Sequence, residues 1–385
     1  MKKFIPYGKQ TISKEDIDVV VKTLKSDFLT QGPLITNFEK RLADYTGAKY
    51  CVVVNSGTAA LHTVYFALGL TQGDEFITSA MTFAATANAG LYLGAKPRFV
   101  DIVLSTGNID ISQIENAITK QTKLISVIHY AGLSVDMEQV KKIAHKHNLL
   151  VVEDACHALG GEYKNEKIGN CKYSDAAILS FHPVKHITTG EGGAILTNHK
   201  DVYQKALMFR SHGITKDDKQ YVNANEGLWY HEMQFLGFNY RMTEIQASLG
   251  ISQLKKIDEF VKRRREIASQ YNELFKDFDL ISTPQEDQQT MHAYHLYPIR
   301  LSNALFKHKQ QIFEDLHQSG IGVQTHYIPV YHHPYYRELG FKNLKLKNTE
   351  EFYQAEISLP MYPALKNSQL KHIIQTLKTI LNSYL

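Results

Sequence analysis

The chain has few cysteines, little net charge and no long apolar run, and each shortage excludes a class of protein. Its 385 residues include three cysteines, Cys51, Cys156 and Cys171, without a CxxC or zinc-like spacing. Neither a disulfide framework nor a structural metal is indicated, and we expect no metal site. No stretch approaches the roughly 18 uninterrupted apolar residues that a membrane span needs. The first residues, MKKFIPYG, lack the apolar segment of a signal peptide.

The charge balance argues against nucleic acid as a partner. There are 43 Lys and Arg against 39 Asp and Glu, a net charge of +4, which is too small and too dispersed for that role. The one dense basic run, KRRRE at 262–266, is interpreted as the solvated face of a helix. With a hydrophobic fraction of 43%, the chain is expected to be a soluble, cytoplasmic protein without membrane or nucleic-acid partners.

Short apolar runs alternate with helical patterns between residues 50 and 200. Most runs are continuous and rich in Val, Ile and Leu, which is typical of strands covered on both faces. The alternation predicts right-handed crossovers and a mostly parallel sheet. Only a glycine-rich stretch separates the last two runs, which favours an antiparallel strand there. The seven runs are 51–56, 75–80, 97–101, 124–130, 149–155, 176–182 and 193–198.

The second part of the chain is expected to form a smaller domain. A helical pattern over 243–276 predicts one long helix that connects two domains. Beyond it, apolar segments at 292–301 and 322–329 read as short strands and alternate with two helical patterns, which indicates an α+β domain. We therefore place a large α/β domain with an N-terminal substrate segment at 1–250, and the linking helix with the small domain at 251–385.

Residues that could bind a ligand follow several of the predicted strands. In open α/β sheets, ligands sit at the carboxyl ends of the strands. After the first strand, NSGTAAL (55–61) places Gly57 and Thr58 at the start of a helix, whose free N–H groups favour a phosphate. A plain Ser/Thr N-cap explains the same string. The chain lacks GxGxxG after this strand and lacks GxxxxGK[ST], so neither usual nucleotide fingerprint is present.

Asp154 ends the fifth predicted strand, in EDACHALG (153–160), and His157 follows three residues later. A carboxylate on a buried strand is costly unless a cation or several donors face it. Asp154 could cap the next turn, or it could be a fixed anion that keeps a cationic ring protonated. His157 by itself is more often a structural or surface histidine.

Lys185 follows the sixth predicted strand, in SFHPVKHITTGEGG (180–193). A lysine amine can form a Schiff base with a carbonyl compound, and pyridoxal phosphate is the cofactor that uses this chemistry most widely. Such a site needs a lysine, an acidic partner for the pyridine nitrogen and a phosphate cradle. A lone lysine here would be a surface charge. Because all three elements occur at strand ends of one framework, the sequence predicts a pyridoxal phosphate site.

Two aromatic segments could complete such a site. Phe83, after the second strand, could stack on the pyridine ring or simply pack in the core. The segment QTHYIPVYHHPYY (324–336) lacks carboxylates and HExxH spacing, so a metal cluster is disfavoured there. Polar aromatic side chains that line a sugar or nucleotide pocket explain this segment better.

Four segments together resemble the DegT/StrS family of pyridoxal-phosphate-dependent nucleotide-sugar aminotransferases. They occur in family order, and the resemblance covers roughly residues 4–380: NSGTAALH, EDACHALG, SFHPVKHITTGEGGAILTN and GFNYRMTEIQASLG. The resemblance implies the fold of type I aminotransferases, with a large, mostly parallel seven-stranded sheet domain and a smaller C-terminal α+β domain. It also implies a homodimer whose active sites are shared between the two subunits.

The resemblance assigns a role to each matching residue. Lys185 would form the Schiff base with pyridoxal 5'-phosphate and later move protons, and Asp154 would face the pyridine nitrogen. The other cofactor contacts would be His157 beside the ring hydroxyl, Phe83 stacked on the ring, Gly57, Thr58 and Ser180 at the phosphate, and Asn239 from the neighbouring subunit. The sugar nucleotide would contact Tyr7, Asp27, Phe28, Leu29, Thr30, Gln324, Thr325, His326 and Tyr327.

Finer motifs are similar to members that serve pseudaminic acid biosynthesis, among them FRSHGITK (209–216) and YAGLSVDM (130–137). They imply transfer of an amino group from L-glutamate to C4 of a UDP-linked 4-keto-6-deoxy-L-sugar, UDP-2-acetamido-2,6-dideoxy-β-L-arabino-hex-4-ulose. The product would be UDP-4-amino-4,6-dideoxy-N-acetyl-β-L-altrosamine. One departure is His186, which stands where the family pattern VKPIT has proline.

Other functions stay open at this point. Sugar dehydratases of the family carry histidine in place of the lysine, so Lys185 argues against that activity. An aminotransferase of the UDP-bacillosamine pathway or of a dTDP-sugar pathway remains open, because sugar selectivity depends on loops. A catalytically silent regulatory relative is the third alternative, and Lys185, Asp154 and Ser180 count against it.

Overall fold

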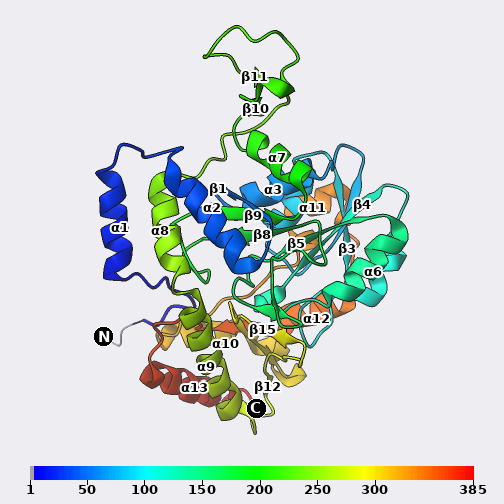
Figure 1. The fold of residues 1–385 in the computed structure, drawn as a ribbon. Helices are drawn as coiled ribbons and strands as arrows, with labels where there is room; N and C mark the ends of the chain where they lie inside the picture. Colours follow the sequence, from blue (N-terminus) through cyan, green and yellow to red (C-terminus); the bar gives the residue numbers. More distant parts are fainter. Residues whose placement is uncertain (1–3) are drawn as a thin grey trace.

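A seven-stranded sheet forms the centre of the larger part of the molecule (Figure 1). The computed structural model describes residues 4–385; residues 1–3, with which the predicted large domain begins, lie outside the described residues. The strand order is β1-β9-β8-β5-β4-β2-β3. The strands are β1 (Tyr50–Val54), β2 (Glu75–Ser79), β3 (Lys96–Val100), β4 (Thr122–Ile128), β5 (Leu150–Asp154), β8 (Ala176–Ser180) and β9 (Gly193–Thr197).

The strand directions confirm the mostly parallel sheet and the predicted antiparallel strand. β8, β5, β4, β2 and β3 are parallel, whereas β9 pairs antiparallel with both β1 and β8. Ser180 lies opposite Gly193, so the chain leaves β8 and re-enters the sheet at the same edge. The glycine-rich stretch between them, which carries Lys185, therefore forms a loop at the carboxyl end of β8.

Helices cover both faces of this sheet, as its continuous apolar strands require. On one face, Val52, Ile178 and Ile195 pack with the helices that follow β1, β2 and β9. On the other face, Val53 and Leu179 pack with helices from the N-terminal segment and from beyond residue 243. The helices of this part are α1 (Lys14–Leu24), α2 (Pro33–Thr46), α3 (Gly57–Ala67), α4 (Ala84–Leu91), α5 (Ile114–Ala117), α6 (Met137–His147), α7 (Lys200–Phe209) and α8 (Glu244–Leu254).

The predicted single helix over 243–276 is wrong, because the chain forms two helices. α8 ends at Leu254 and α9 (Ile257–Phe275) begins after a break, in which Lys255 keeps helical backbone angles and Lys256 leaves them. The capping box of Thr243 and Gln246 fixes the start of α8. The break lets α8 pack against α1 and α2, while α9 continues to the smaller part of the molecule (Figure 1).

The interpretation of the basic run as a solvated face is wrong for Arg264, which is 1% exposed. Its Nη1 donates to the carbonyl oxygens of Tyr294, His295 and Met361 at 3.0–3.2 Å. Arg264 is buried because α9 packs on this side against the segment that leads into the small sheet. The neighbouring Lys262 is exposed, as predicted.

The smaller part combines an antiparallel sheet with helices. Its core includes Tyr297, Ile299, Ile312, Leu316 and Ile373. The sheet order is β12-β14-β15. Its strands and helices are β12 (Ile281–Ser282), β14 (Tyr297–Leu301), β15 (Glu356–Leu359), α10 (Lys309–Gln318), α11 (Pro334–Tyr336), α12 (Lys347–Ala355) and α13 (Asn367–Asn382). We propose that the two parts are separate domains, with α9 as the connecting helix. The predicted boundary between residues 1–250 and 251–385 falls inside α8, which continues to Leu254, so we propose the break before α9 as the boundary.

One strand predicted for this part is shorter and one is wrong. The strand predicted over 292–301 begins only at Tyr297. Residues 322–329 form an isolated bridge between Gln324 and Ser358 in place of a strand. Within this segment, His326 and Tyr327 both line the cavity described below.

Two small sheets lie outside these cores. β13 (Thr290–Met291), β6 (Glu162–Tyr163) and β7 (Glu166–Lys167) form one, and β10 (Ile214–Thr215) with β11 (Glu232–Met233) forms the other. The β10–β11 hairpin and its long loop project away from the body as an arm (Figure 1). Among the helices of residues 4–385, none combines the length and the apolar character needed to cross a membrane.

Candidate active site

A cavity of about 810 Å³ opens at the carboxyl ends of the central strands, where the two parts of the molecule meet. Its volume lies within the range of ligand pockets. Predicted site residues contribute many of its walls: Tyr7, Gly57, Thr58, Phe83, Asp154, His157, Ser180, Lys185, His326 and Tyr327. The cavity therefore unites residues from β5, β8, α3, the loop after β2, the N-terminal segment and the smaller part of the molecule.

The N-terminus of α3 forms one end of the cavity. Ser56 is the N-cap residue and its Oγ accepts the N–H of Ala59 at 3.1 Å. The preceding N–H groups, of Gly57 and Thr58, have no partner inside the helix, and both residues line the cavity. A Cβ at Gly57 would lie 3.0 Å from Cβ of Ser180, so the backbone and Ser180 approach closely here. This end suits a phosphate.

Asp154 lies at the end of β5 with its carboxylate held from two sides. Oδ2 accepts a hydrogen bond from Oγ1 of Thr86 at 2.7 Å, and Oδ1 accepts one from the backbone N–H of Cys156 at 3.3 Å. The side chain is 4% exposed. A buried carboxylate held in this way is a fixed negative charge that faces the cavity.

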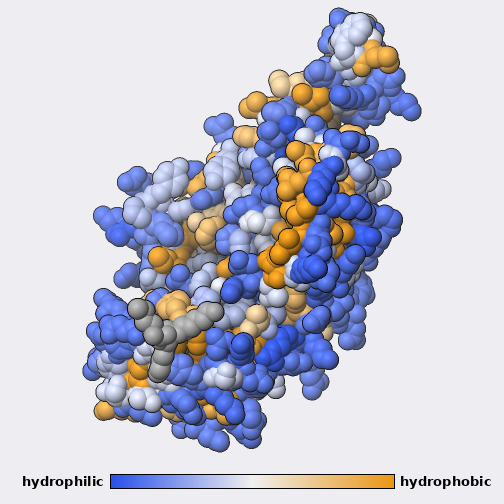
Figure 2. All heavy atoms as spheres, turned by 90° about the vertical axis from the view of Figure 1, so that its left-hand side faces the viewer, coloured by the Kyte–Doolittle hydropathy of each residue, from blue (hydrophilic) through white to orange (hydrophobic). Residues whose placement is uncertain are grey.

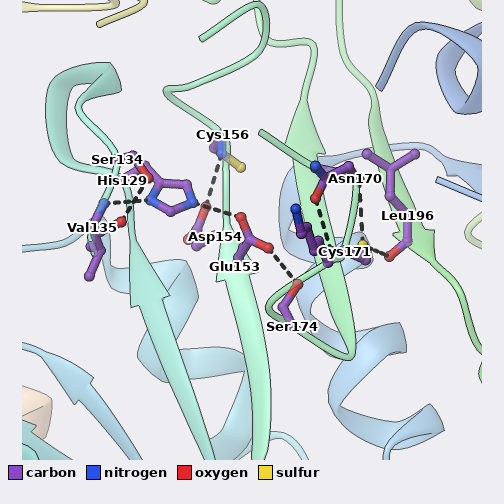
Figure 3. A network of polar contacts seen from close by, with 12 residues as sticks. His129, Ser134, Val135, Glu153, Asp154, Cys156, Asn170, Cys171, Ser174 and Leu196 are labelled. Atoms are coloured by element: carbon purple, nitrogen blue, oxygen red, sulfur yellow. Dashed lines mark hydrogen bonds and ion pairs between the residues drawn. The ribbon is translucent and has the colours of Figure 1, made fainter. Parts of the chain in front are cut away.

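A second buried network lies behind Asp154 and fixes its strand (Figure 3). Nε2 of His129 lies 2.9 Å from Oε2 of Glu153, and Nδ1 of His129 accepts the N–H of Val135 at 3.1 Å. Because Nδ1 accepts a hydrogen bond, the ring proton is on Nε2, which donates a hydrogen bond to the carboxylate of Glu153. The hydroxyl of Ser174 donates to the other oxygen of Glu153. These hydrogen bonds join the ends of β4 and β5 on the face of the sheet opposite to the side chain of Asp154.

Lys185 reaches into the cavity from the loop after β8. Its Nζ lies 3.3 Å from Nε2 of His295. Burial lowers the pKa of Lys185 below its ordinary value; the neighbouring Cys156 and Asp154 oppose this shift, and Arg264 adds to it. A lysine with a lowered pKa has a larger fraction of free amine, which is the form that reacts with a carbonyl and accepts a proton.

His157 lies between Lys185 and the aromatic wall. Its Nε2 is 2.9 Å from the hydroxyl of Tyr327, and its ring centroid is 4.4 Å from that of His295. Burial, followed by the charge of Lys185, places the pKa of His157 well below its ordinary value, so the ring is neutral. Within the described residues, Nδ1 of His157 is buried without a hydrogen-bond partner. It is therefore available to a ligand atom.

Phe83 presents an open aromatic face at the mouth of the cavity. It is 61% exposed, which is unusual for a phenylalanine, and its centroid lies 6.1 Å from that of Tyr327. It directly precedes α4 and so is held by the same turn that carries Thr86. An exposed ring at this place can stack on a flat ligand.

The residues present fit pyridoxal phosphate. The free Nδ1 of His157, the Gly57 backbone that any Cβ would crowd, the fixed carboxylate of Asp154 and the amine of Lys185 match four different parts of that molecule. Among residues 4–385, no group of three or more His, Cys, Asp and Glu side chains is arranged to hold a metal ion.

Several predicted contacts lie outside the cavity of this chain. Asn239, Asp27, Phe28, Leu29, Thr30 and Gln324 are exposed, and Thr325 is half-buried. The loop that carries residues 27–30 is anchored to the start of α8, where Glu244 N–H donates to the carbonyl of Leu29 at 3.0 Å. The roles of these residues in cofactor and substrate binding stay predictions.

The structure adds side chains that sequence reasoning missed. Thr86 contacts Asp154, and His295 contacts Lys185. Three further residues line the cavity: Asn55, Glu191 and Gln246. Thr86 had a signal, since it lies three residues after Phe83, in the first turn of the helix that Phe83 precedes. His295 had no such signal, because its contact with Lys185 spans 110 residues.

His186, which replaces the expected proline, is buried beside the lysine. It is 3% exposed, and its Nε2 lies 3.0 Å from the carbonyl oxygen of Ala293. The ring thereby ties the loop of Lys185 to the segment that precedes β14. A hydrogen bond thus supports the loop at the position where the family has the rigidity of proline.

Comparison with known proteins agrees with this geometry. Residues 10–378 match the DegT/DnrJ/EryC1/StrS aminotransferase family, and the chain belongs to this family. It is therefore an aminotransferase with the type I fold. It is 41% identical over 380 residues to the UDP-4-amino-4,6-dideoxy-N-acetyl-beta-L-altrosamine transaminase of Campylobacter jejuni, a match that covers 98% of this chain and 97% of the relative.

Two solved structures share the whole fold. Helicobacter pylori PseC, described as an aminotransferase involved in the biosynthesis of pseudoaminic acid, superposes with a TM-score of 0.93 at 38% identity and covers 99% of this chain and 100% of its own. The PLP form of a putative sugar aminotransferase, Spr1654 of Streptococcus pneumoniae, has a TM-score of 0.92 at 30% identity, with the same coverage. Family and fold together indicate pyridoxal phosphate as the cofactor.

Proposed function

We propose that the chain transfers an amino group from L-glutamate to C4 of UDP-2-acetamido-2,6-dideoxy-β-L-arabino-hex-4-ulose. The product is UDP-4-amino-4,6-dideoxy-N-acetyl-β-L-altrosamine, a step of pseudaminic acid biosynthesis in the cytoplasm. The observation that carries the proposal is the pairing of Lys185 and Asp154 at the ends of neighbouring strands in one cavity. The 41% identity to the transaminase of Campylobacter jejuni supports the choice of sugar.

Pyridoxal phosphate, when bound, supplies an electron sink that makes the α-hydrogen of an amino acid acidic. Lys185 is proposed as the residue that holds the cofactor covalently as a Schiff base. Once released from that link, the free Nζ of Lys185 would remove the proton from the α-carbon of the amino acid. Its lowered pKa supports this role, since the amine must be unprotonated to act as a base.

Asp154, His157 and Phe83 are proposed to orient the cofactor. The carboxylate of Asp154 would keep the ring nitrogen protonated, and Thr86 and Cys156 prevent it from turning away. His157 would donate through Nδ1 to the ring hydroxyl, because its Nε2 faces the hydroxyl of Tyr327. Gly57, Thr58 and Ser180 would hold the phosphate through N–H and O–H donors.

The sugar nucleotide is proposed to bind between the N-terminal segment and the small domain. Tyr7 and His326 pack with ring centroids 5.5 Å apart, and Tyr327 continues this wall toward His157. Two hydrogen bonds to the backbone of His326 hold this wall in place. The hydroxyl of Tyr130 donates to the carbonyl oxygen of His326, and the backbone N–H of His326 donates to the carboxylate of Glu356. Gln324 and Thr325 would contact the nucleotide at the open edge.

We also propose that the protein is a homodimer with shared active sites. Ile17, Val21 and Leu24 form an exposed apolar stripe on α1, and exposed Phe28 and Leu29 continue it. Figure 2 shows an apolar band on this face of the molecule. Such a band suits a second copy of the chain. In a dimer, exposed Asn239 and the loop of residues 27–30 would complete the cavity of the neighbouring subunit.

The test is a product assay with alternative sugars. Purified protein would be given L-glutamate and, separately, the proposed UDP-sugar, the 4-keto precursor of UDP-bacillosamine and a dTDP-4-keto-6-deoxy sugar. Mass spectrometry would measure the amino sugar that forms, and an enzymatic assay would measure the 2-oxoglutarate. We expect the proposed sugar to give equal amounts of the amino sugar and 2-oxoglutarate. Its kcat/KM should be well above the values for the other two sugar nucleotides. Preference for another sugar would reject the substrate, and absence of 2-oxoglutarate with every sugar would reject the activity.

A further inference from the structure

His295 is the side chain that the free amine of Lys185 contacts, and the proposed function gives it no role. It lies in the segment before β14, and its Nε2 is 3.3 Å from Nζ of Lys185. The ring is 4% exposed. A contact between a buried imidazole and a half-buried amine is unfavourable if both are charged, so the protonation of the pair needs an explanation.

The surroundings determine which of the two groups stays neutral. Burial, the charge of Lys185, His157, His186 and the charge of Arg264 together place the pKa of His295 well below its ordinary value. A neutral imidazole has one N–H donor and one acceptor nitrogen. A lysine ammonium has donors only. Toward the ammonium form of Lys185, Nε2 of His295 can therefore only accept, which places the ring proton on Nδ1, a buried atom without a hydrogen-bond partner among the described residues.

The segment that carries His295 is clamped from two sides. Nη1 of Arg264 donates to the carbonyl oxygens of Tyr294 and His295 at 3.1 and 3.2 Å. On the other side, Nε2 of His186 donates to the carbonyl of Ala293 at 3.0 Å. His186 is adjacent to Lys185 in the chain. The lysine loop and the segment of residues 293–295 are thus held as one unit, which keeps the two nitrogens in register.

We propose that His295 is a positioning residue for Lys185: its Nε2 accepts a hydrogen bond from the lysine amine whenever that amine is not linked to the cofactor. This inference rests on the proposed function, in which Lys185 is released and later moves a proton. The contact keeps the released amine in the cavity for the next proton transfer. His186 and Arg264 act through it, because they fix the backbone that carries the ring.

The hydrogen bond shifts the pKa of Lys185 in a direction that can be measured. It stabilises the ammonium form of Lys185, so its removal lowers the pKa of the amine further. A charged His295 would instead destabilise the ammonium form of Lys185, so its removal would raise the pKa of the amine. The other groups that face Lys185 stay constant in the comparison: Asp154, Cys156, His157, His186, Arg264 and His326.

The experiment is competitive acetylation of amines in the cofactor-free protein as a function of pH, with mass spectrometry of the peptide that contains Lys185. His295→Leu removes the acceptor and His295→Gln keeps one at similar reach. His292→Leu is the matched control, because His292 is equally buried and lies in the same segment but outside the cavity lining. Acetylation reports on the amine whether or not cofactor binds.

We expect the labelling midpoint of Lys185 to fall by about one to two pH units in His295→Leu, the value of a buried hydrogen bond to a charged group. His295→Gln and His292→Leu should keep the midpoint of the natural protein. An unchanged or raised midpoint in His295→Leu would overturn the inference. Should His295→Leu fail to fold, His295→Ala, which also lacks the acceptor, takes its place with the same outcomes: a midpoint that falls supports the inference, and one that is unchanged or raised overturns it.

A second measurement separates this inference from the proposed function. Pyridoxal phosphate is added to the cofactor-free natural protein and its visible absorption band is followed. If no band forms, the proposed function fails and the inference fails with it. If the band forms while the acetylation midpoint of His295→Leu is unchanged, only the inference fails.

Discussion

Thr86 donates a hydrogen bond of 2.7 Å to the carboxylate of Asp154, across the gap between α4 and the end of β5. The same turn of the chain presents Phe83 to the cavity. One connection thus orients both the proposed charge partner and the proposed stacking partner of the cofactor ring.

Thr86→Val should lower kcat/KM about tenfold, because Oδ2 of Asp154 loses a donor that is typically worth about 1.5 kcal/mol or more to a charged acceptor. The cofactor should still bind, and Thr86→Ser should restore most of the rate. Steady-state kinetics with glutamate checks this. Equal rates for Thr86→Val and the natural protein would contradict the role of this contact.

Asp154→Asn should retain the covalent cofactor but reduce turnover roughly 10²–10³-fold, since loss of one partner from a buried charge pair typically costs about 3–5 kcal/mol. The ring nitrogen would then face a neutral amide. Single-turnover rates with glutamate would show the loss in the first half-reaction. Turnover within a few-fold of the natural protein would exclude Asp154 as the partner of the ring nitrogen.

Gly57→Ala should weaken binding of pyridoxal phosphate at least tenfold. The new Cβ would lie 3.0 Å from Cβ and 3.2 Å from Oγ of Ser180, where the phosphate is proposed to bind. Thr58→Ser keeps the N–H and the hydroxyl and is the matched control. Equilibrium titration of the cofactor-free proteins measures both affinities. Similar affinities for Gly57→Ala and Thr58→Ser would place the phosphate elsewhere.

His62 should make the protein less stable in acid. It is 3% exposed among the rings of Tyr92, Phe209 and Phe238, and burial lowers its pKa to about 4. Because the folded pKa is below the unfolded value of about 6.5, this contribution is fully present above pH 6.5 and is lost as the pH falls toward 4. The loss amounts to roughly 3 kcal/mol of unfolding free energy.

Urea unfolding between pH 4 and 7 measures this dependence. His62→Asn does not titrate and keeps an acceptor near the hydroxyl of Tyr240, which lies 3.1 Å from Nδ1 of His62. Its unfolding free energy should be lower at pH 7 but should fall less steeply below pH 6.5. The same slope in both proteins would show that His62 does not titrate in this range.

The sequence allowed the sheet and the strand-end residues to be predicted for one physical reason. Parallel strands end at the same edge, so Asp154 and Lys185, with the start of α3 at Gly57, had to lie near one another once the apolar runs were recognised. The antiparallel direction of β9 followed from the absence of a crossover helix before it.

The features that were missed depend on contacts between distant segments. Helical periodicity continues through Lys255 and Lys256, although one helix ends and another begins there. α8 and the first turns of α9 pack in the core of the larger part, and the later turns of α9 pack in the core of the smaller part. Burial of Arg264 depends on carbonyl groups about 30 and 97 positions away. The contact of His295 with Lys185 likewise has no local pattern that sequence reasoning could use.

The covalent attachment of pyridoxal phosphate to Lys185 is the central claim, and borohydride reduction tests it most directly. The protein loaded with pyridoxal phosphate would be reduced, digested and analysed by mass spectrometry, beside the Lys185→Ala variant. We predict a phosphopyridoxyl group on Lys185 in the natural protein, and neither that group nor turnover in Lys185→Ala. A modified lysine elsewhere, or turnover that survives in Lys185→Ala, would contradict the account.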